Sequence, residues 1–196
     1  MNIMAMSTLG HHCCLGKEKN KVVRKVNIKE DLTLVGLLKD CAKHKDFHKG
    51  IALHDALFRS GLLEKNSYVG NSIVNMYVKC GAMLKAEQVF QELPIRNEVS
   101  WSSLIAGYAQ QCRGYEALKC FERMRYEGYL VDAITFICIM KACGTIGAID
   151  EGKMIYNETV SRGLINKNII LGTTLVDMYA RCGLFTEAQY GLDVLP

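Results

Sequence analysis

The feature that most constrains this chain is an internal repeat with a period of 102 residues. At that offset residues 71–81 (NSIVNMYVKCG) align with residues 173–183 (TTLVDMYARCG). A second offset of 31 residues aligns Tyr77 with Tyr108, Ala86 with Ala117 and Phe90 with Phe121. Units of this length are typical of solenoids, in which each unit packs only on its neighbours.

The repeat register divides the chain into a basic tail at 1–30 and an array at 31–196. The array contains units at 31–66, 67–97, 98–132, 133–168 and 169–196, the last of them incomplete. Within the second unit, apolar residues recur at helical spacing, Gly81 suits a left-handed helix end, and Pro94 stops a second helix. Ala86, Ala117 and Ala188 recur where two helices would approach closely. The pattern predicts an all-α fold, an α-solenoid of tandem helix-turn-helix repeats.

The net charge is +4, but most of it lies in the tail. Residues 1–32 carry six Lys or Arg against three acids, so about +1 remains for the rest. The array is therefore not a general polyanion binder, and any nucleic-acid binding needs specific contacts. The tail resembles at most a degenerate organellar presequence, because acids are interspersed among its basic residues. No apolar run reaches the length of a membrane span.

The cysteines and histidines do not form a reactive or metal-binding pattern. Nine cysteines occur, an odd number, and none forms a C-x-x-C pair. We expect most of them to be small core residues rather than disulfide partners or zinc ligands. The five histidines show no ligand spacing, and no phosphate-binding loop or nucleophile elbow appears. These observations predict a chain without catalytic residues, metal or cofactor.

Four strings carry a family resemblance: residues 71–81, WSSLIAGYAQ at 101–110, TFICIMKAC at 135–143 and residues 173–183. They resemble the plant pentatricopeptide-repeat family over residues 31–196. The alternating unit lengths resemble its PLS subclass, in which standard, long and short repeats alternate. The zinc deaminase-like domain that often follows such arrays needs H-x-E and C-x-x-C, and this chain has neither.

The resemblance implies a right-handed superhelix whose first helices line a groove for single-stranded RNA, about one base per repeat. It implies a role in organellar RNA processing or C-to-U editing, in a mitochondrion or chloroplast. An editing or processing enzyme would then be supplied in trans. Neither DNA nor a membrane is an expected partner.

In that family, the fifth and last residues of a repeat select the base. The corresponding residues here are Asn71 with Asn97, Ser102 with Asp132, and Thr173. The first pair resembles a pyrimidine reader, the second a purine reader favouring guanine, and Thr173 a purine reader. The long repeats have Val35 with Asn66 and Ile137 with Asn168; an aliphatic fifth side chain cannot bond a base, so these repeats are expected to act as spacers.

Two further sets of side chains follow from the same resemblance. Second-position residues would wedge between successive bases: Leu32, Tyr68, Val99, Ile134 and Ile170. Three cations late in the first helices would reach phosphates: Lys43, Lys79 and Arg181. Structural roles stand beside these readings. The fifth residues could be solvated polar groups, Asn97 and Asp132 suit helix N-caps, and Lys79 and Arg181 suit a helix C-terminus.

Two other interpretations stay open at this stage. The near-neutral array and the apolar Val35 and Ile137 also fit a protein-interaction scaffold like the tetratricopeptide arrays, whose groove binds peptides. The sequence ends inside a hairpin, which is expected to expose Leu175, Val176 and Leu195 and which fits a fragment, a non-functional remnant or an array completed by a partner.

Overall fold

The computed structural model describes residues 28–64, 66–165 and 168–194, with the side chains of 33–192. The tail at 1–27, and with it most of the predicted presequence, lies outside the described residues. Within the described part the chain forms ten α-helices and no strand. The helices are α1 (Ile28–His44), α2 (Phe47–Ser60), α3 (Ser67–Lys79), α4 (Met83–Glu92), α5 (Glu98–Gln110), α6 (Gly114–Tyr126), α7 (Ala133–Ile146), α8 (Ile149–Ser161), α9 (Ile169–Arg181) and α10 (Phe185–Val194).

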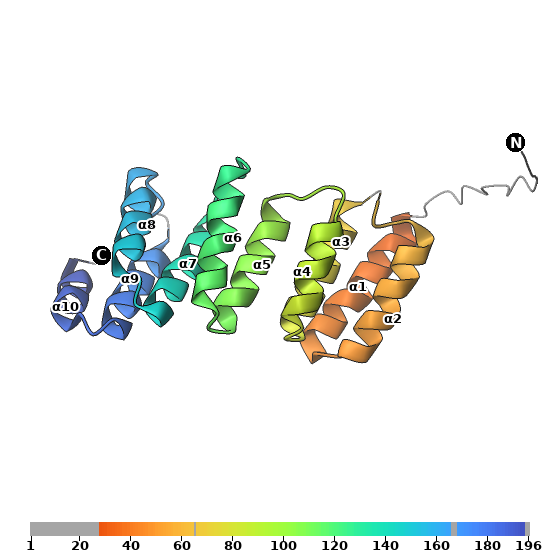
Figure 1. Cartoon of the computed structure of the whole chain (residues 1–196), viewed down its shortest axis with the longest axis horizontal. Coiled ribbons are helices and arrows are strands. Elements are labelled where there is room, and N and C mark those ends of the chain that lie inside the picture. The colour runs from red at the N-terminus through yellow and green to blue at the C-terminus, as the bar shows by residue number, and fades with distance from the viewer. Residues whose placement is uncertain (1–27, 65, 166–167, 195–196) are drawn as a thin grey trace, which may run out of the picture.

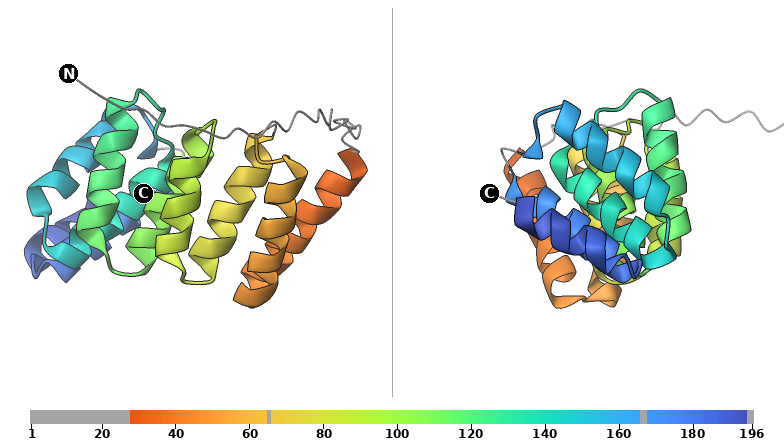
Figure 2. Two further views of the ribbon diagram at one scale, coloured as in Figure 1. Left: turned by 45° about the vertical axis from the view of Figure 1, so that its right-hand side comes forward. Right: turned by 90° about the vertical axis from the view of Figure 1, so that its left-hand side faces the viewer.

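The helices pair into five hairpins that follow one another along the long axis of the molecule, from α1–α2 at one end to α9–α10 at the other (Figure 1). Two further views show the same succession from the side and from the α9–α10 end (Figure 2). Each odd-numbered helix packs on the next odd-numbered helix, α1 on α3, α3 on α5, α5 on α7 and α7 on α9. The first helices of the repeats therefore form one continuous layer. The predicted all-α solenoid is confirmed.

The repeat borders coincide with helix N-caps. Asn66, Asn97, Asp132 and Asn168 are the residues before α3, α5, α7 and α9, and each side chain accepts a hydrogen bond from a backbone N–H in the first turn. Such caps satisfy N–H groups that have no partner inside the helix. The last residue of a repeat is thus a structural cap, as predicted for Asn97 and Asp132. The first helix begins at Ile28, three residues before the expected start of the array.

The turn residues also act as the sequence predicts. Gly81 follows α3 with φ 78°, a left-handed conformation that glycine adopts without steric cost. The helix α4 ends at Glu92, two residues before Pro94. Both features fix where the chain reverses between the helices of a repeat.

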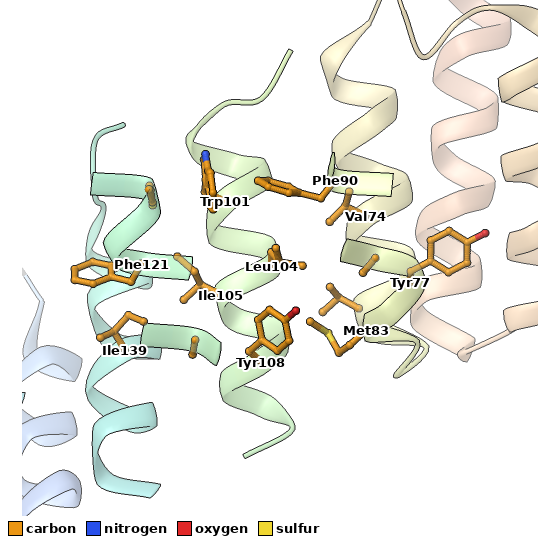
Figure 3. Packing of buried hydrophobic residues seen from close by; sticks show 14 of the residues in the cluster. Val74, Tyr77, Met83, Phe90, Trp101, Leu104, Ile105, Tyr108, Phe121 and Ile139 are labelled. Atoms are coloured by element: carbon orange, nitrogen blue, oxygen red, sulfur yellow. The ribbon is translucent and has the colours of Figure 1, made fainter. Parts of the chain in front are cut away.

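The core runs through all the hairpins as one layer of apolar side chains. On α5, Trp101, Leu104 and Tyr108 are buried. They lie between Phe90 of α4 on one side and Phe121 of α6 and Ile139 of α7 on the other (Figure 3). The Phe90 and Trp101 rings meet edge to face with centroids 4.6 Å apart, a favourable aromatic geometry. Ala86 and Ala117 have no exposed surface, which confirms that they lie where helices approach closely.

One sequence-based expectation needs correction here. Leu175 is buried and Val176 is half-buried rather than exposed, because α9 packs against both α7 and α10. Leu195 lies outside the described residues. The described cysteines are mostly core residues, as expected: Cys41 and Cys143 are buried, four half-buried ones pack against the core, and Cys112 is exposed. Burial raises the pKa of the Cys143 thiol to about 12, which keeps it protonated and unreactive.

Candidate nucleic-acid interface

A groove of about 340 Å³ crosses the layer of first helices between α3, α5 and α7. Its volume is at the lower end of the roughly 300–1,000 Å³ of small-molecule sites. It extends along α5 from Glu98 to Gln110, a length of about 18 Å at 1.5 Å per residue. The lining residues are Asn75, Val78, Lys79, Glu98, Val99, Ser102, Ser103, Ala106, Gln110, Asp132 and Ile134. Five residues predicted to contact RNA are among them: Lys79, Val99, Ser102, Asp132 and Ile134.

The fifth and last residues of the third repeat are linked by a third side chain. The Ser102 and Thr135 hydroxyl oxygens lie 2.7 Å apart. The Thr135 hydroxyl lies 2.6 Å from Asp132 Oδ1, which also accepts the Thr135 backbone N–H at 2.8 Å. The Ser102–Asp132 pair was predicted from the repeat register, whereas Thr135 was not. Only the packing of α5 on α7 brings Thr135 against Ser102.

The second repeat links the same two positions directly. Asn71 Nδ2 donates to Asn97 Oδ1 at 3.0 Å, and the same oxygen accepts the Ser100 backbone N–H at 3.1 Å. Asn71 is only 6% exposed, and its Oδ1 has no hydrogen-bond partner among the described residues. In this conformation Asn71 therefore does not face the groove, and it leaves a buried acceptor unsatisfied. Such an acceptor costs about 1–3 kcal/mol.

The four described second-position side chains project from the surface at the start of the first helices. Tyr68, Val99, Ile134 and Ile170 are 49%, 59%, 64% and 54% exposed. Exposed aliphatic and aromatic side chains at one register, repeated from hairpin to hairpin, form a row of apolar surfaces. Lys39 of α1 contacts one member of this row: its ammonium lies 2.8 Å from the Tyr68 hydroxyl and 5.4 Å from the centre of the Tyr68 ring. Lys39 was not among the residues predicted from the sequence. Leu32 lies in α1, and its side chain is outside the described part.

The remaining fifth positions differ in burial. Thr173 is exposed, and its hydroxyl donates to the Ile170 carbonyl at 3.1 Å. Val35 is buried and Ile137 is half-buried. Their partners Asn66 and Asn168 use their side chains to cap the backbone N–H groups of Tyr68 and Ile170. The long repeats thus keep the cap at the last position but have no polar group at the fifth.

The three predicted phosphate-binding cations are exposed. Lys79 lies at the end of α3 and lines the groove, and Lys43 lies in the last turn of α1. Arg181, at the end of α9, forms an ion pair with Asp177 at 2.8 Å, and this pair raises the pKa of the guanidinium further above its usual range. Among the described residues no acid forms an ion pair with Lys79 or Lys43, whereas Asp177 already neutralises part of the charge of Arg181.

The described residues hold no group of histidines, cysteines and acids that could bind a metal ion. His48 is exposed, and His54 is half-buried with its Nδ1 3.0 Å from the Tyr77 hydroxyl. In the part of the chain that the structure covers, no helix is both long and apolar enough to cross a membrane.

Comparison with known proteins matches this architecture to one family. Residues 71–97 match the model described as "PPR repeat", and residues 96–145 match the "PPR repeat family" model. A mitochondrial pentatricopeptide repeat-containing protein of Arabidopsis thaliana is 34% identical over 170 residues, or 87% of this chain. A chloroplastic one from the same plant is 32% identical over 85% of the chain. The chain spans only 30% and 27% of these two relatives.

Solved structures show the same fold. The pentatricopeptide repeat protein PPR10 from maize superposes with a TM-score of 0.65 at 24% identity. The structure of PPR10 in complex with an 18-nucleotide RNA element superposes with a TM-score of 0.69, over 84% of this chain and 24% of the PPR10 chain. The nuclear proteinaceous RNase P 2 of Arabidopsis thaliana gives 0.61 at 17% identity, over 83% of this chain and 37% of the other.

Proposed function

We propose that this chain, which is an array of pentatricopeptide repeats, binds a short segment of single-stranded RNA across its first helices. The observation that carries the proposal is the groove between α3, α5 and α7, where polar side chains of the third repeat lie between the apolar Val99 and Ile134. An unpaired base has a polar edge and two apolar faces. The polar side chains complement the edge, and Val99 and Ile134 complement the two faces.

Each apolar side chain at the second position would contact the face of a base. Val99 and Ile134 flank the third repeat's polar pair, and Tyr68 and Val99 flank that of the second repeat. Stacking of a base on an aromatic side chain contributes about 1–3 kcal/mol and tolerates any base. Tyr68 would therefore add affinity without selecting a sequence.

Base selection would come from the two complete repeats with a polar fifth residue. Ser102 with Asp132 would read a purine, favouring guanine, and Asn71 with Asn97 would read a pyrimidine. Because Asn71 is buried, we infer that its amide turns toward the groove when RNA binds. Its unsatisfied oxygen favours that rotation, since a base N–H would supply the missing donor. Thr173 would read a purine in the last repeat, and Val35 and Ile137 would make their repeats spacers.

The cations would bind the backbone. Lys79 in the groove and Lys43 at the end of α1 are exposed and would each displace a counterion from a phosphate. Arg181 would contact phosphate while paired with Asp177. With few such contacts, binding is expected to be modest and to weaken with salt.

In the cell the array would act in organellar RNA processing or C-to-U editing, as one module of the PLS subclass, with the enzyme supplied in trans. The mitochondrial and chloroplastic relatives support an organellar location.

Selection from a random RNA pool tests the proposal, using the wild type and Asn71→Thr. The wild type should enrich a short motif, and the variant should change one position from pyrimidine to purine. Lys79→Ala should weaken binding to every sequence and reduce the salt dependence by about 0.7 in the slope of log K against log salt. Lys85→Ala is the matched control, because Lys85 is exposed on the second helix α4 and should change neither. No enrichment by a folded wild type at moderate salt would refute RNA binding.

A second candidate is peptide binding on the opposite layer. A cavity of about 380 Å³ between α4 and α6 combines the buried Trp101 with charged side chains such as Arg113 and Lys119. The Trp101 Nε1–H has no hydrogen-bond partner among the described residues. This scaffold function would be favoured if the wild type selects no RNA but binds members of a peptide library. Lys119→Glu should then abolish the peptide binding.

A further inference from the structure

The side chain of Thr135 belongs to none of the positions predicted to contact RNA, yet it lies between two that do. It is the third residue of the fourth repeat and is completely buried in the first turn of α7. Its hydroxyl oxygen is 2.7 Å from Ser102 Oγ and 2.6 Å from Asp132 Oδ1. Both neighbours line the groove, whereas Thr135 lies behind them.

The three groups can share their protons in only one order. An ionised carboxylate accepts hydrogen bonds and cannot donate, so the Thr135 hydroxyl must donate its single proton to Asp132. Thr135 then has only lone pairs left for Ser102. The Ser102 hydroxyl must therefore donate to Thr135, and its own proton is directed away from the groove.

This order fixes what the third repeat offers to a ligand. Ser102 presents lone pairs to the groove and acts as an acceptor. Asp132 Oδ1 is already bonded to the backbone N–H and hydroxyl of Thr135, which leaves its second carboxylate oxygen as another acceptor. Two acceptors match the guanine edge, where N1–H and N2–H₂ are adjacent donors. Adenine offers one donor, N6–H₂, beside the acceptor N1, which would face a lone pair.

We propose that Thr135 is a positioning residue that sets the base preference of the third repeat by holding Ser102 as a hydrogen-bond acceptor. The proposal rests on the RNA-binding function proposed above. It means that selection at one repeat depends on the third residue of the next repeat, in addition to the fifth and last residues.

The second repeat provides an internal contrast. Ser100 occupies the same register as Thr135, but its hydroxyl contacts the backbone N–H and carbonyl of Asn97. Asn71 instead bonds Asn97 directly. A hydroxyl at the third position of a repeat therefore decides whether the fifth residue of the preceding repeat donates or accepts only where that fifth residue also carries a hydroxyl.

The test compares wild type, Thr135→Val and Thr135→Ser on two RNA oligonucleotides that differ only by guanine or adenine opposite the third repeat. Valine keeps the β-branched shape and the backbone N–H to Asp132 but lacks the hydroxyl. Ser102 is then free to donate to adenine N1, and the guanine-to-adenine affinity ratio should fall about tenfold, the scale of one specific base contact. Thr135→Ser retains the hydroxyl and should keep the wild-type ratio. Ser100→Ala should leave the ratio unchanged.

The outcomes separate the two proposals. A folded wild type that binds neither RNA overturns the proposed function, and this inference with it. A wild type that prefers guanine, with Thr135→Val losing affinity for both oligonucleotides equally, shows a merely structural threonine and overturns only the inference. Thr135→Ala also lacks the hydroxyl and should lower the guanine-to-adenine affinity ratio as Thr135→Val does. It replaces the valine variant if the valine side chain disturbs the turn. Circular dichroism of each variant establishes that it is folded.

Discussion

Replacing Asn71 by leucine should remove base selection at the second repeat without destabilising the fold. Leucine has nearly the shape of asparagine but no polar atoms. In the wild type, Asn71 makes one hydrogen bond through Nδ2 and leaves a buried Oδ1 without a partner. Aliphatic residues already occupy this register at Val35 and Ile137.

The magnitude follows from these two atoms. Losing the bond to Asn97 costs about 0.5–1.5 kcal/mol, and removing the orphaned acceptor gains about 1–3 kcal/mol. Asn97 keeps its bond from the Ser100 backbone N–H, so no new unsatisfied acceptor is created. The balance is between neutral and about 2 kcal/mol stabilising, or a rise in Tm of up to about 8 °C for an array of this size.

Urea and thermal unfolding followed by circular dichroism measure this effect. Fluorescence anisotropy with the selected RNA measures the loss of base preference. Asn97→Ala is the informative partner variant, because it removes the cap of α5 and leaves Asn71 with no partner, for an expected loss of about 2–4 kcal/mol. In the Asn71→Leu background the same change should cost only the cap, about 1 kcal/mol. Destabilisation of more than about 1 kcal/mol by Asn71→Leu alone would show that the Asn71 amide stabilises the fold.

Two further predictions concern the fold. Gly107→Ala should destabilise the fold by about 1–3 kcal/mol, because the new Cβ would lie 2.7 Å from Met83 Sδ. Gly36→Ala should stabilise the fold by about 0.5–1 kcal/mol, because its Cβ would meet nothing within 4 Å. Equal stabilities of the two variants in urea unfolding would contradict this. Burial lowers the pKa of His54 beside Tyr77, so the stability from neutral His54 is complete above its unfolded pKa near 6.5 and is lost as pH falls through the lower folded pKa. Between pH 7 and pH 5 the unfolding free energy should fall more in the wild type than in His54→Gln, and equal slopes would contradict the assignment.

The repeat sequence is sufficient to predict most of this fold. The repeat unit occurs five times along the chain, the last time incompletely, and this recurrence predicts the solenoid. Glycine, proline and cap residues then indicate where the helices end, as at Gly81 and Asn97. The start of α1 at Ile28 was harder to place, because the preceding residues have no counterpart in the other repeats.

The candidate site was only partly predictable. The register identified Ser102 and Asp132 because they occupy fixed positions within one repeat. Thr135 and Lys39 act across repeat borders, and their contacts depend on how one first helix packs on the next. Burial of Asn71 likewise follows from packing, since a polar residue at the same register is exposed at Thr173.

The most direct test of the central claim is to map where RNA touches the array. Photocrosslinking of an RNA containing 4-thiouridine, followed by mass spectrometry of the peptides, assigns each contact to a helix. RNA bound across the first helices should crosslink to their starts, at Tyr68, Val99 and Ile134. Crosslinks confined to exposed side chains of the second helices, such as Tyr115 and Tyr126 of α6, would contradict it.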